Sequence, residues 1–194
     1  VISWSPTGSL APGIVSCPNK TLIRAANGIS EEEKTWLEGR DRVTNANLIK
    51  FLESKLENFD ASNFVENASR PIRLAIGVSG GGWRAALVSA GQLAAFDDRT
   101  RGDSGLAGIL QSATYLSGLS GGNWLTGTLA MNNFTSIQQI LDEGEIWNLE
   151  SSALNPQWDL NYTAEYYKTI RQDLDDKKKA GFPVTTSDTW GRVT

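Results

Sequence analysis

The chain has 194 residues, of which 40% are hydrophobic and 21% charged, and this suits one globular domain with a sizeable core. The formal net charge is −4, so composition gives no indication of nucleic acid as a partner. No apolar stretch approaches the ~20 residues of a membrane-spanning helix. One cysteine and no histidine argue against a zinc site, and any serine chemistry must use a base other than imidazole.

The N-terminal residues 1–29 contain several prolines and glycines, which predicts an irregular arm laid over the domain. Ser30 followed by Glu33 is a capping box, and it predicts a helix that runs to about Arg42. The side chains expected to face inward from this helix are Trp36 and Leu37.

A second helix is predicted from about Asn45 to Asn58, because apolar residues recur there every four positions. The members of this stripe are Leu48, Leu52 and Leu56, with Ile49 alongside.

Two strand-turn-helix units follow. Residues 72–78 form a short apolar run that leads into Gly80-Gly81-Gly82 and then a helical pattern to Phe96. Residues 113–116 form the next run, which leads into Gly118-Leu119-Ser120-Gly121-Gly122 and a helix to about Met131. This repetition predicts an α/β fold, with a parallel or mixed sheet covered by helices and both glycine elbows at the carboxyl ends of the strands.

The last third of the chain reads as mostly helical. Ser136 is expected to cap a helix over residues 137–141, and a long helix is expected from about Ala164 to Lys179, ending at Gly181. Core packing is expected for four large side chains within helices: Trp36, Trp83, Trp124 and Met131.

Ser120 is the candidate nucleophile, because Gly118-Leu119-Ser120-Gly121-Gly122 fits G-x-S-x-G, the turn that lifts a serine hydroxyl from a strand end into a cleft. The alternative is a structural strand-to-helix turn with no chemistry.

The first elbow is the candidate oxyanion hole. Glycine N–H groups ahead of a helix can stabilise the negative charge of a tetrahedral intermediate. Arg84, one turn into the helix, is a candidate phosphate clamp, with a structural salt bridge as its alternative.

A competing interpretation of the first elbow is a dinucleotide-binding module, because Gly80, Gly82 and Ala85 fit G-x-G-x-x-A and Asp103 lies near the expected acidic position. The segment between Asp97 and Gly105 reads as a loop where that module needs a second strand. A non-catalytic α/β scaffold, with both elbows as packing turns, is the third possibility.

Four N-x-[ST] acceptor sites point to the secretory pathway, and hence to a secreted, extracellular or cell-wall glycoprotein. The asparagines are Asn19, Asn67, Asn133 and Asn161. In a secreted protein the single Cys17 suggests a disulfide to a cysteine outside this chain.

Together these segments resemble the fungal phospholipase B family of secreted lysophospholipases, whose catalytic domain is related to the animal cytosolic phospholipases of the A-two class. The resemblance rests mainly on Ser79-Gly80-Gly81-Gly82-Trp83-Arg84-Ala85 and Ser117-Gly118-Leu119-Ser120-Gly121-Gly122-Asn123-Trp124, and it covers nearly the whole chain.

The resemblance implies hydrolysis of fatty acyl esters of lysophospholipids and glycerophospholipids at a membrane or micelle surface, without a metal or other cofactor. It places the nucleophile on Ser120, the oxyanion glycines on Gly81 and Gly82, and the phosphate-side arginine on Arg84. The family's base is an aspartate in an Asp-Gly-Gly segment, which does not occur here. Residues 1–194 are therefore expected to be the N-terminal part of one catalytic domain, inactive without the rest.

Overall fold

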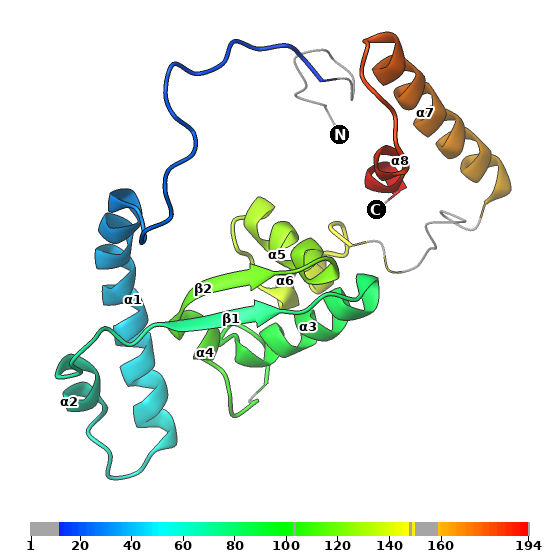
Figure 1. Ribbon diagram of the computed structural model, residues 1–194. Helices are drawn as coiled ribbons and strands as arrows, with labels where there is room; N and C mark the ends of the chain where they lie inside the picture. The colour runs from blue at the N-terminus through cyan, green and yellow to red at the C-terminus, as the bar shows by residue number, and fades with distance from the viewer. Residues whose placement is uncertain (1–11, 103, 148, 150–158, 194) are drawn as a thin grey trace. The chain divides into compact units, whose positions relative to one another are not determined.

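The computed structural model describes residues 12–102, 104–147, 149 and 159–193. The chain divides into two compact units, one formed by residues 26–147 and the other by Val1–Ala25 and Asn148–Thr194. The first unit contains both strands and the helices α1 to α6, and the second contains α7 and α8 (Figure 1).

Helix α1 spans Glu31–Lys55. It begins where the capping box predicts, because the Ser30 hydroxyl accepts a hydrogen bond from the Glu33 N–H at 3.1 Å. The two helices expected over residues 31–58 are one, which corrects the prediction. No glycine or proline interrupts residues 43–45, and the Thr44 hydroxyl bonds back to the Arg40 carbonyl at 3.2 Å.

The buried face of α1 carries Leu37, Thr44 and Leu48. Trp36 was expected to point inward, but it is 47% exposed and packs beside the Tyr115 ring, with centroids 5.7 Å apart. Leu56 is also exposed, because it lies just beyond the end of α1. The short helix α2, Ala61–Glu66, packs against α1.

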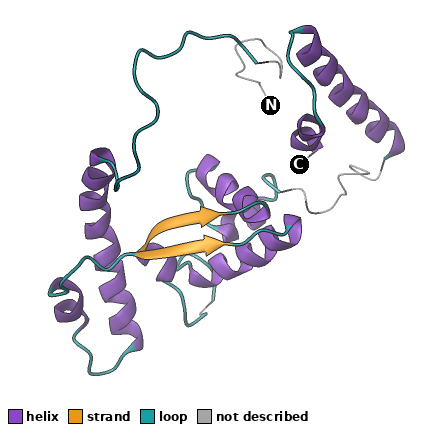
Figure 2. Ribbon diagram, in the orientation of Figure 1, coloured by secondary structure: helices purple, strands orange, loops and turns teal. Residues whose placement is uncertain are grey.

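The sheet confirms the α/β prediction. Strand β1, Leu74–Val78, pairs in parallel with β2, Ala113–Gly118, and Val78 lies opposite Gly118 (Figure 2). The crossover contains α3, Gly82–Phe96, and the short α4, Ile109–Ser112. As expected, the strands alternate with helices.

Helices α3 and α5, the latter spanning Gly121–Met131, pack on each other and on α6, Ile137–Glu143, around one hydrophobic core. The Ser136 hydroxyl caps α6, as predicted, by accepting from the Gln139 N–H at 3.1 Å. The buried core residues are Val78, Ala86, Ala90, Leu93, Leu125, Leu129, Ile137, Ile140 and Trp147.

Besides Trp36, two more of the side chains expected in the core lie on the surface. Met131 is the last residue of α5 and is 88% exposed, and Trp83 in the first turn of α3 is 41% exposed. Both sit at helix ends, where fewer neighbours surround a side chain than in the middle of a helix.

In the second unit, α7 spans Leu160–Lys179 and ends before Gly181, which has a φ of 88°. The following helix α8, Thr186–Val193, has no counterpart among the predicted elements. An ion pair between Lys177 and Asp188 ties α8 to α7. Among the residues that the structure describes, no helix has the length and apolar character to span a bilayer.

Candidate active site

The two glycine elbows lie side by side at the carboxyl end of the paired strands (Figure 1). The Leu119 N–H donates a hydrogen bond to the Val78 carbonyl at 3.0 Å, which extends the strand pairing into the second elbow. The sheet therefore brings together two segments that are about forty residues apart in the sequence.

Ser120 sits at the sharpest point of the second elbow. It is the N-cap residue of α5, with φ of 52° and ψ of −121°, and its side chain makes no capping hydrogen bond to the helix. A non-glycine residue at positive φ is strained, typically by ~1–3 kcal/mol. The residue is exposed, so the strained turn presents the hydroxyl at the surface of the unit.

The glycines of the second elbow are required by close backbone approach. A Cβ at Gly118 would lie 2.4 Å from the Gly122 carbonyl oxygen, and one at Gly122 would lie 2.6 Å from the Val78 carbonyl oxygen. These separations are far below van der Waals contact. The turn that raises Ser120 therefore forms only with small residues at both positions.

Two further glycines allow the backbones of the two elbows to approach each other closely. A Cβ at Gly121 would lie 2.0 Å from the Gly82 carbonyl oxygen, and a Cβ at Gly80 would lie 2.9 Å from the Ser120 Cβ. The first elbow therefore runs directly beside the candidate nucleophile, which is where an oxyanion hole must lie.

The candidate oxyanion glycines begin α3. Gly81 is its N-cap residue with φ of 138°, and Gly82 is its first residue with φ of 63°. The first N–H groups of a helix lack partners within it and form the positive end of the helix dipole. This end of α3 is suited to negative charge, and no acidic residue occupies its first turn.

Arg84 is exposed in the first turn of α3. No ion pair joins it to another residue in the described ranges, so the salt-bridge alternative finds no partner there. Arg84 lies two residues after Gly82, at the end of α3 that meets the second elbow.

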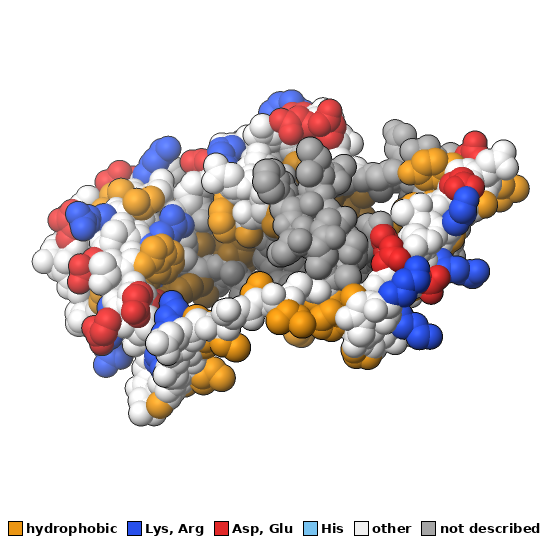
Figure 3. All heavy atoms as spheres, turned by 90° about the horizontal axis from the view of Figure 1, so that it is seen from above, with side chains coloured by type: hydrophobic (Ala, Val, Ile, Leu, Met, Phe, Trp, Pro, Cys, Tyr) orange, Lys and Arg blue, Asp and Glu red, His pale blue; other side chains and the backbone are white. Residues whose placement is uncertain are grey.

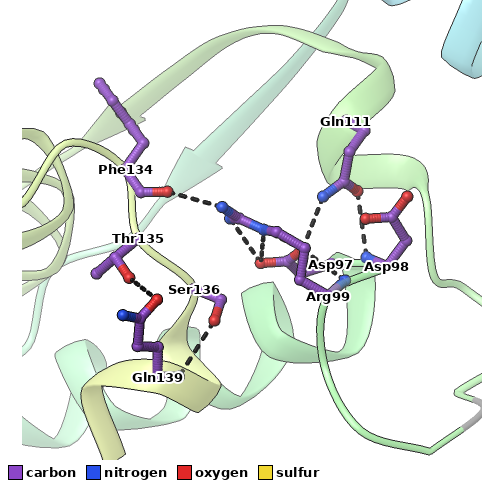
Figure 4. Close-up of polar contacts among 8 residues, drawn as sticks. All are labelled: Asp97, Asp98, Arg99, Gln111, Phe134, Thr135, Ser136 and Gln139. Atoms are coloured by element: carbon purple, nitrogen blue, oxygen red, sulfur yellow. Dashed lines mark hydrogen bonds and ion pairs between the residues drawn. The ribbon is translucent and has the colours of Figure 1, made fainter. Parts of the chain in front are cut away.

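Asp97, which the sequence did not single out, is the centre of a buried polar cluster (Figure 4). Its carboxylate is 1% exposed and accepts hydrogen bonds from the Arg99 guanidinium at 2.8 to 3.1 Å and from Gln111 Nε2 at 2.7 Å. Arg99 also donates to the Phe134 carbonyl at 2.9 Å. Burial raises the pKa of the Asp97 carboxyl, but the hydrogen bonds from Arg99 and Gln111 outweigh it and hold the pKa below its usual value.

This cluster cannot supply the base for Ser120. The 15 residues of α3 separate Asp97 from the oxyanion glycines, which is a distance of about 20 Å at the rise of an α-helix. Asp97 instead ties the loop after α3 to α4 through Gln111, and it orients Arg99, which bonds to the loop between α5 and α6.

A cavity of about 660 Å³ lies away from the elbows. It is lined by α1, by β2 and by the loops that carry the Asp97 cluster, and neither Ser120 nor the glycine triplet contributes to it. The chemistry indicated by the elbows thus belongs to a more open surface.

The dinucleotide alternative needs a strand directly after α3, and the described residues there contain none. The described residues between Asp97 and Gly105 form turns and bends, as expected, and β2 begins only at Ala113. Asp103 lies outside the described residues.

Acidic and basic side chains are intermixed on the face shown in Figure 3, with apolar side chains between them. The coloured part of this face carries no patch of a single sign, in keeping with the net charge of −4.

The four glycosylation acceptors Asn19, Asn67, Asn133 and Asn161 are all exposed. Cys17 is a free, exposed thiol, and its disulfide stays a prediction.

The family model of the lysophospholipase catalytic domain matches residues 74–194, which include both elbows. The chain belongs to this family. It is 46% identical to Lysophospholipase 2 of Saccharomyces cerevisiae over 98% of the chain and 29% of that relative. It is 44% identical to Lysophospholipase 1 of the same yeast, over 100% of the chain and 31% of that relative.

A third relative, the lysophospholipase of Torulaspora delbrueckii, is 45% identical over 99% of the chain and 31% of its own length. The chain thus spans about three tenths of the length of the curated relatives it matches. No solved structure matches it. The family resemblance inferred from the paired elbows is confirmed.

Proposed function

We propose that the full-length protein hydrolyses fatty acyl esters of lysophospholipids and glycerophospholipids, with Ser120 as the nucleophile. The observation that carries this proposal is the strained, exposed Ser120 held against the glycine loop at the start of α3. Membership of the lysophospholipase family and the names of the yeast relatives support the substrate class.

The first half of the reaction acylates the serine. Ser120 Oγ attacks the ester carbonyl carbon, and the carbonyl oxygen takes up negative charge in front of the Gly81 and Gly82 N–H groups. As the carbon–oxygen bond of the ester breaks, the proton from Ser120 passes to the leaving glycerophosphoryl alcohol. The second half is the attack of water on the acyl-serine, which releases the fatty acid and restores the hydroxyl.

Both proton transfers need a general base, and the chain has no histidine to serve as one. The family resemblance implies an aspartate in an Asp-Gly-Gly segment, and no such segment occurs in residues 1–194. Arg84 is placed to hold the phosphate of the headgroup through its fork of donors.

A fluorophosphonate, which phosphonylates activated serines, tests the nucleophile in the full-length protein. We expect labelling of Ser120 and none in Ser120→Ala. Ser117→Ala, which removes another exposed serine from the strand that leads into the elbow, is the matched control and should label normally. Equal labelling of the Ser120→Ala variant and the unmodified protein would refute the proposed nucleophile.

Arg84 is tested by comparing a lysophospholipid with a neutral ester of the same acyl chain. Arg84→Ala should raise KM for the phosphate-bearing substrate by on the order of tenfold, since a charged hydrogen bond contributes about 1.5–3 kcal/mol. KM for the neutral ester should stay within about twofold, and an equal rise for both substrates would contradict the phosphate role.

The four exposed acceptor asparagines support a second proposal, that the protein is a secreted or cell-wall glycoprotein acting at a membrane or micelle surface. Treatment of the protein from its natural source with peptide N-glycosidase should lower its mass. An unchanged mass would count against passage through the secretory pathway.

A further inference from the structure

Two tryptophans flank the paired elbows. Trp83 directly follows Gly82, and Trp124 is four residues beyond Ser120 in α5. Their rings pack at 5.2 Å between centroids with an interplanar angle of 43°. The pair therefore bridges the first turns of α3 and α5, the two helices that carry the proposed oxyanion hole and nucleophile.

The pair is partly exposed in this unit, and so is an apolar residue next to Ser120 in the sequence. Trp83 is 41% exposed, Trp124 is half-buried, and Leu119, which immediately precedes Ser120, is 71% exposed. Side chains in a helix lean toward its N-terminus, so Trp124 leans toward the turn that begins at Ser120. Large apolar side chains so close to a nucleophile point to a ligand with an apolar part.

The position of Arg84 indicates how such a ligand would lie. Consecutive residues of a helix point about 100° apart, so Trp83 and Arg84 diverge from the same glycine loop. A lipid ester has the same division, with an apolar acyl chain on one side of the carbonyl and a phosphate on the other. Trp83 would therefore contact the acyl chain, and Arg84 would contact the phosphate of the same substrate.

We propose that Trp83, Trp124 and Leu119 form the contact surface for the acyl chain and set the chain-length preference of the enzyme. This inference rests on the proposed esterase function. Each methylene that such a surface removes from water favours the longer ester by about fourfold.

The test measures kcat/KM of the full-length protein for a series of lysophosphatidylcholines from short to long acyl chains. For Trp83→Ala and Trp124→Ala we expect a loss of about 10- to 100-fold with the longest chain and under about threefold with the shortest, following the loss of a few methylene contacts. Trp83→Leu, which keeps an apolar side chain, should recover part of the dependence on chain length.

The matched control is Trp36→Ala. Trp36 is also exposed and also packs on an aromatic ring, that of Tyr115, but it lies in α1 away from the elbows. Its removal should leave the dependence on chain length unchanged.

Three results would overturn the inference. A uniform loss at all chain lengths would show that the tryptophan pair only holds the glycine loop in place. An unchanged chain-length profile would show that other parts of the protein cover the pair, and an equal change in Trp36→Ala would show a general effect on stability. Fluorophosphonate labelling tests the proposed function independently of this inference. If the unmodified protein is labelled at Ser120, the esterase proposal stands whatever the dependence on chain length shows.

Discussion

Adding one methyl group at Gly121 should separate the two elbows. The Cβ of Gly121→Ala would lie 2.0 Å from the Gly82 carbonyl oxygen, 2.7 Å from its carbonyl carbon and 2.8 Å from its nitrogen. All three atoms are backbone, so no side-chain rotation relieves the overlap. Overpacking typically costs about 1–3 kcal/mol, and a clash with fixed backbone belongs at the upper end, so we expect a loss of about 3 kcal/mol.

The same helix offers the control. A Cβ at Gly127 in α5 would meet nothing within 4 Å, so Gly127→Ala should be neutral or stabilising by up to about 1 kcal/mol through helix propensity. Both variants are compared in the full-length protein by urea unfolding and by the rate of fluorophosphonate labelling at Ser120. Gly121→Ala should lower both the urea concentration at the midpoint of unfolding and the rate of labelling, and Gly127→Ala should lower neither.

The opposite result is that Gly121→Ala unfolds at the same urea concentration as the unmodified protein and is labelled at the same rate. That result would mean that the elbows are not in backbone contact. The oxyanion glycines would then lose their place beside Ser120.

Two further predictions concern the fold around the site. Ser30→Ala removes the cap of α1 and should lower the unfolding free energy by about 1 kcal/mol, whereas Ser54→Ala, near the other end of α1, should change it little. Asp97→Asn should cost about 2–3 kcal/mol in urea unfolding, since it breaks charged hydrogen bonds at a buried site. The folded pKa of Asp97 lies below the unfolded value of about 3.9, so its contribution is complete above that pH and is lost as pH falls through the folded pKa. Between pH 6 and pH 2 the free energy of unfolding should therefore fall less in Asp97→Asn than in the unmodified protein. An equal fall in both proteins would contradict the buried ion pair.

Much of the candidate site could be predicted from the sequence because it is encoded locally. Gly118 is needed for a contact with Gly122 inside the turn itself, and the strand and helix on either side have their own periodicity. The caps at Ser30 and Ser136 are local hydrogen bonds across three residues, and both formed as expected.

Other features could not be predicted, because they depend on tertiary contacts or on the position of a residue within its helix. The Glu33 carboxylate accepts from the Tyr115 hydroxyl at 2.8 Å, a contact across 82 positions that no capping rule anticipates. Asp97 looks like an ordinary loop carboxylate until Gln111 and Arg99 enclose it. Core packing is expected for Trp83 because it lies in a predicted helix, but its place at the start of that helix leaves it exposed.

Local sequence patterns specify the two strand-elbow-helix units and the sharp turn at Ser120. These follow from backbone sterics and hydrogen bonds between near neighbours, which a short stretch of residues contains. The contact between the two elbows, with Gly121 against Gly82 and Gly80 against Ser120, is visible only in the folded protein. That contact depends on the parallel pairing of β1 with β2, a long-range interaction whose register no local pattern contains.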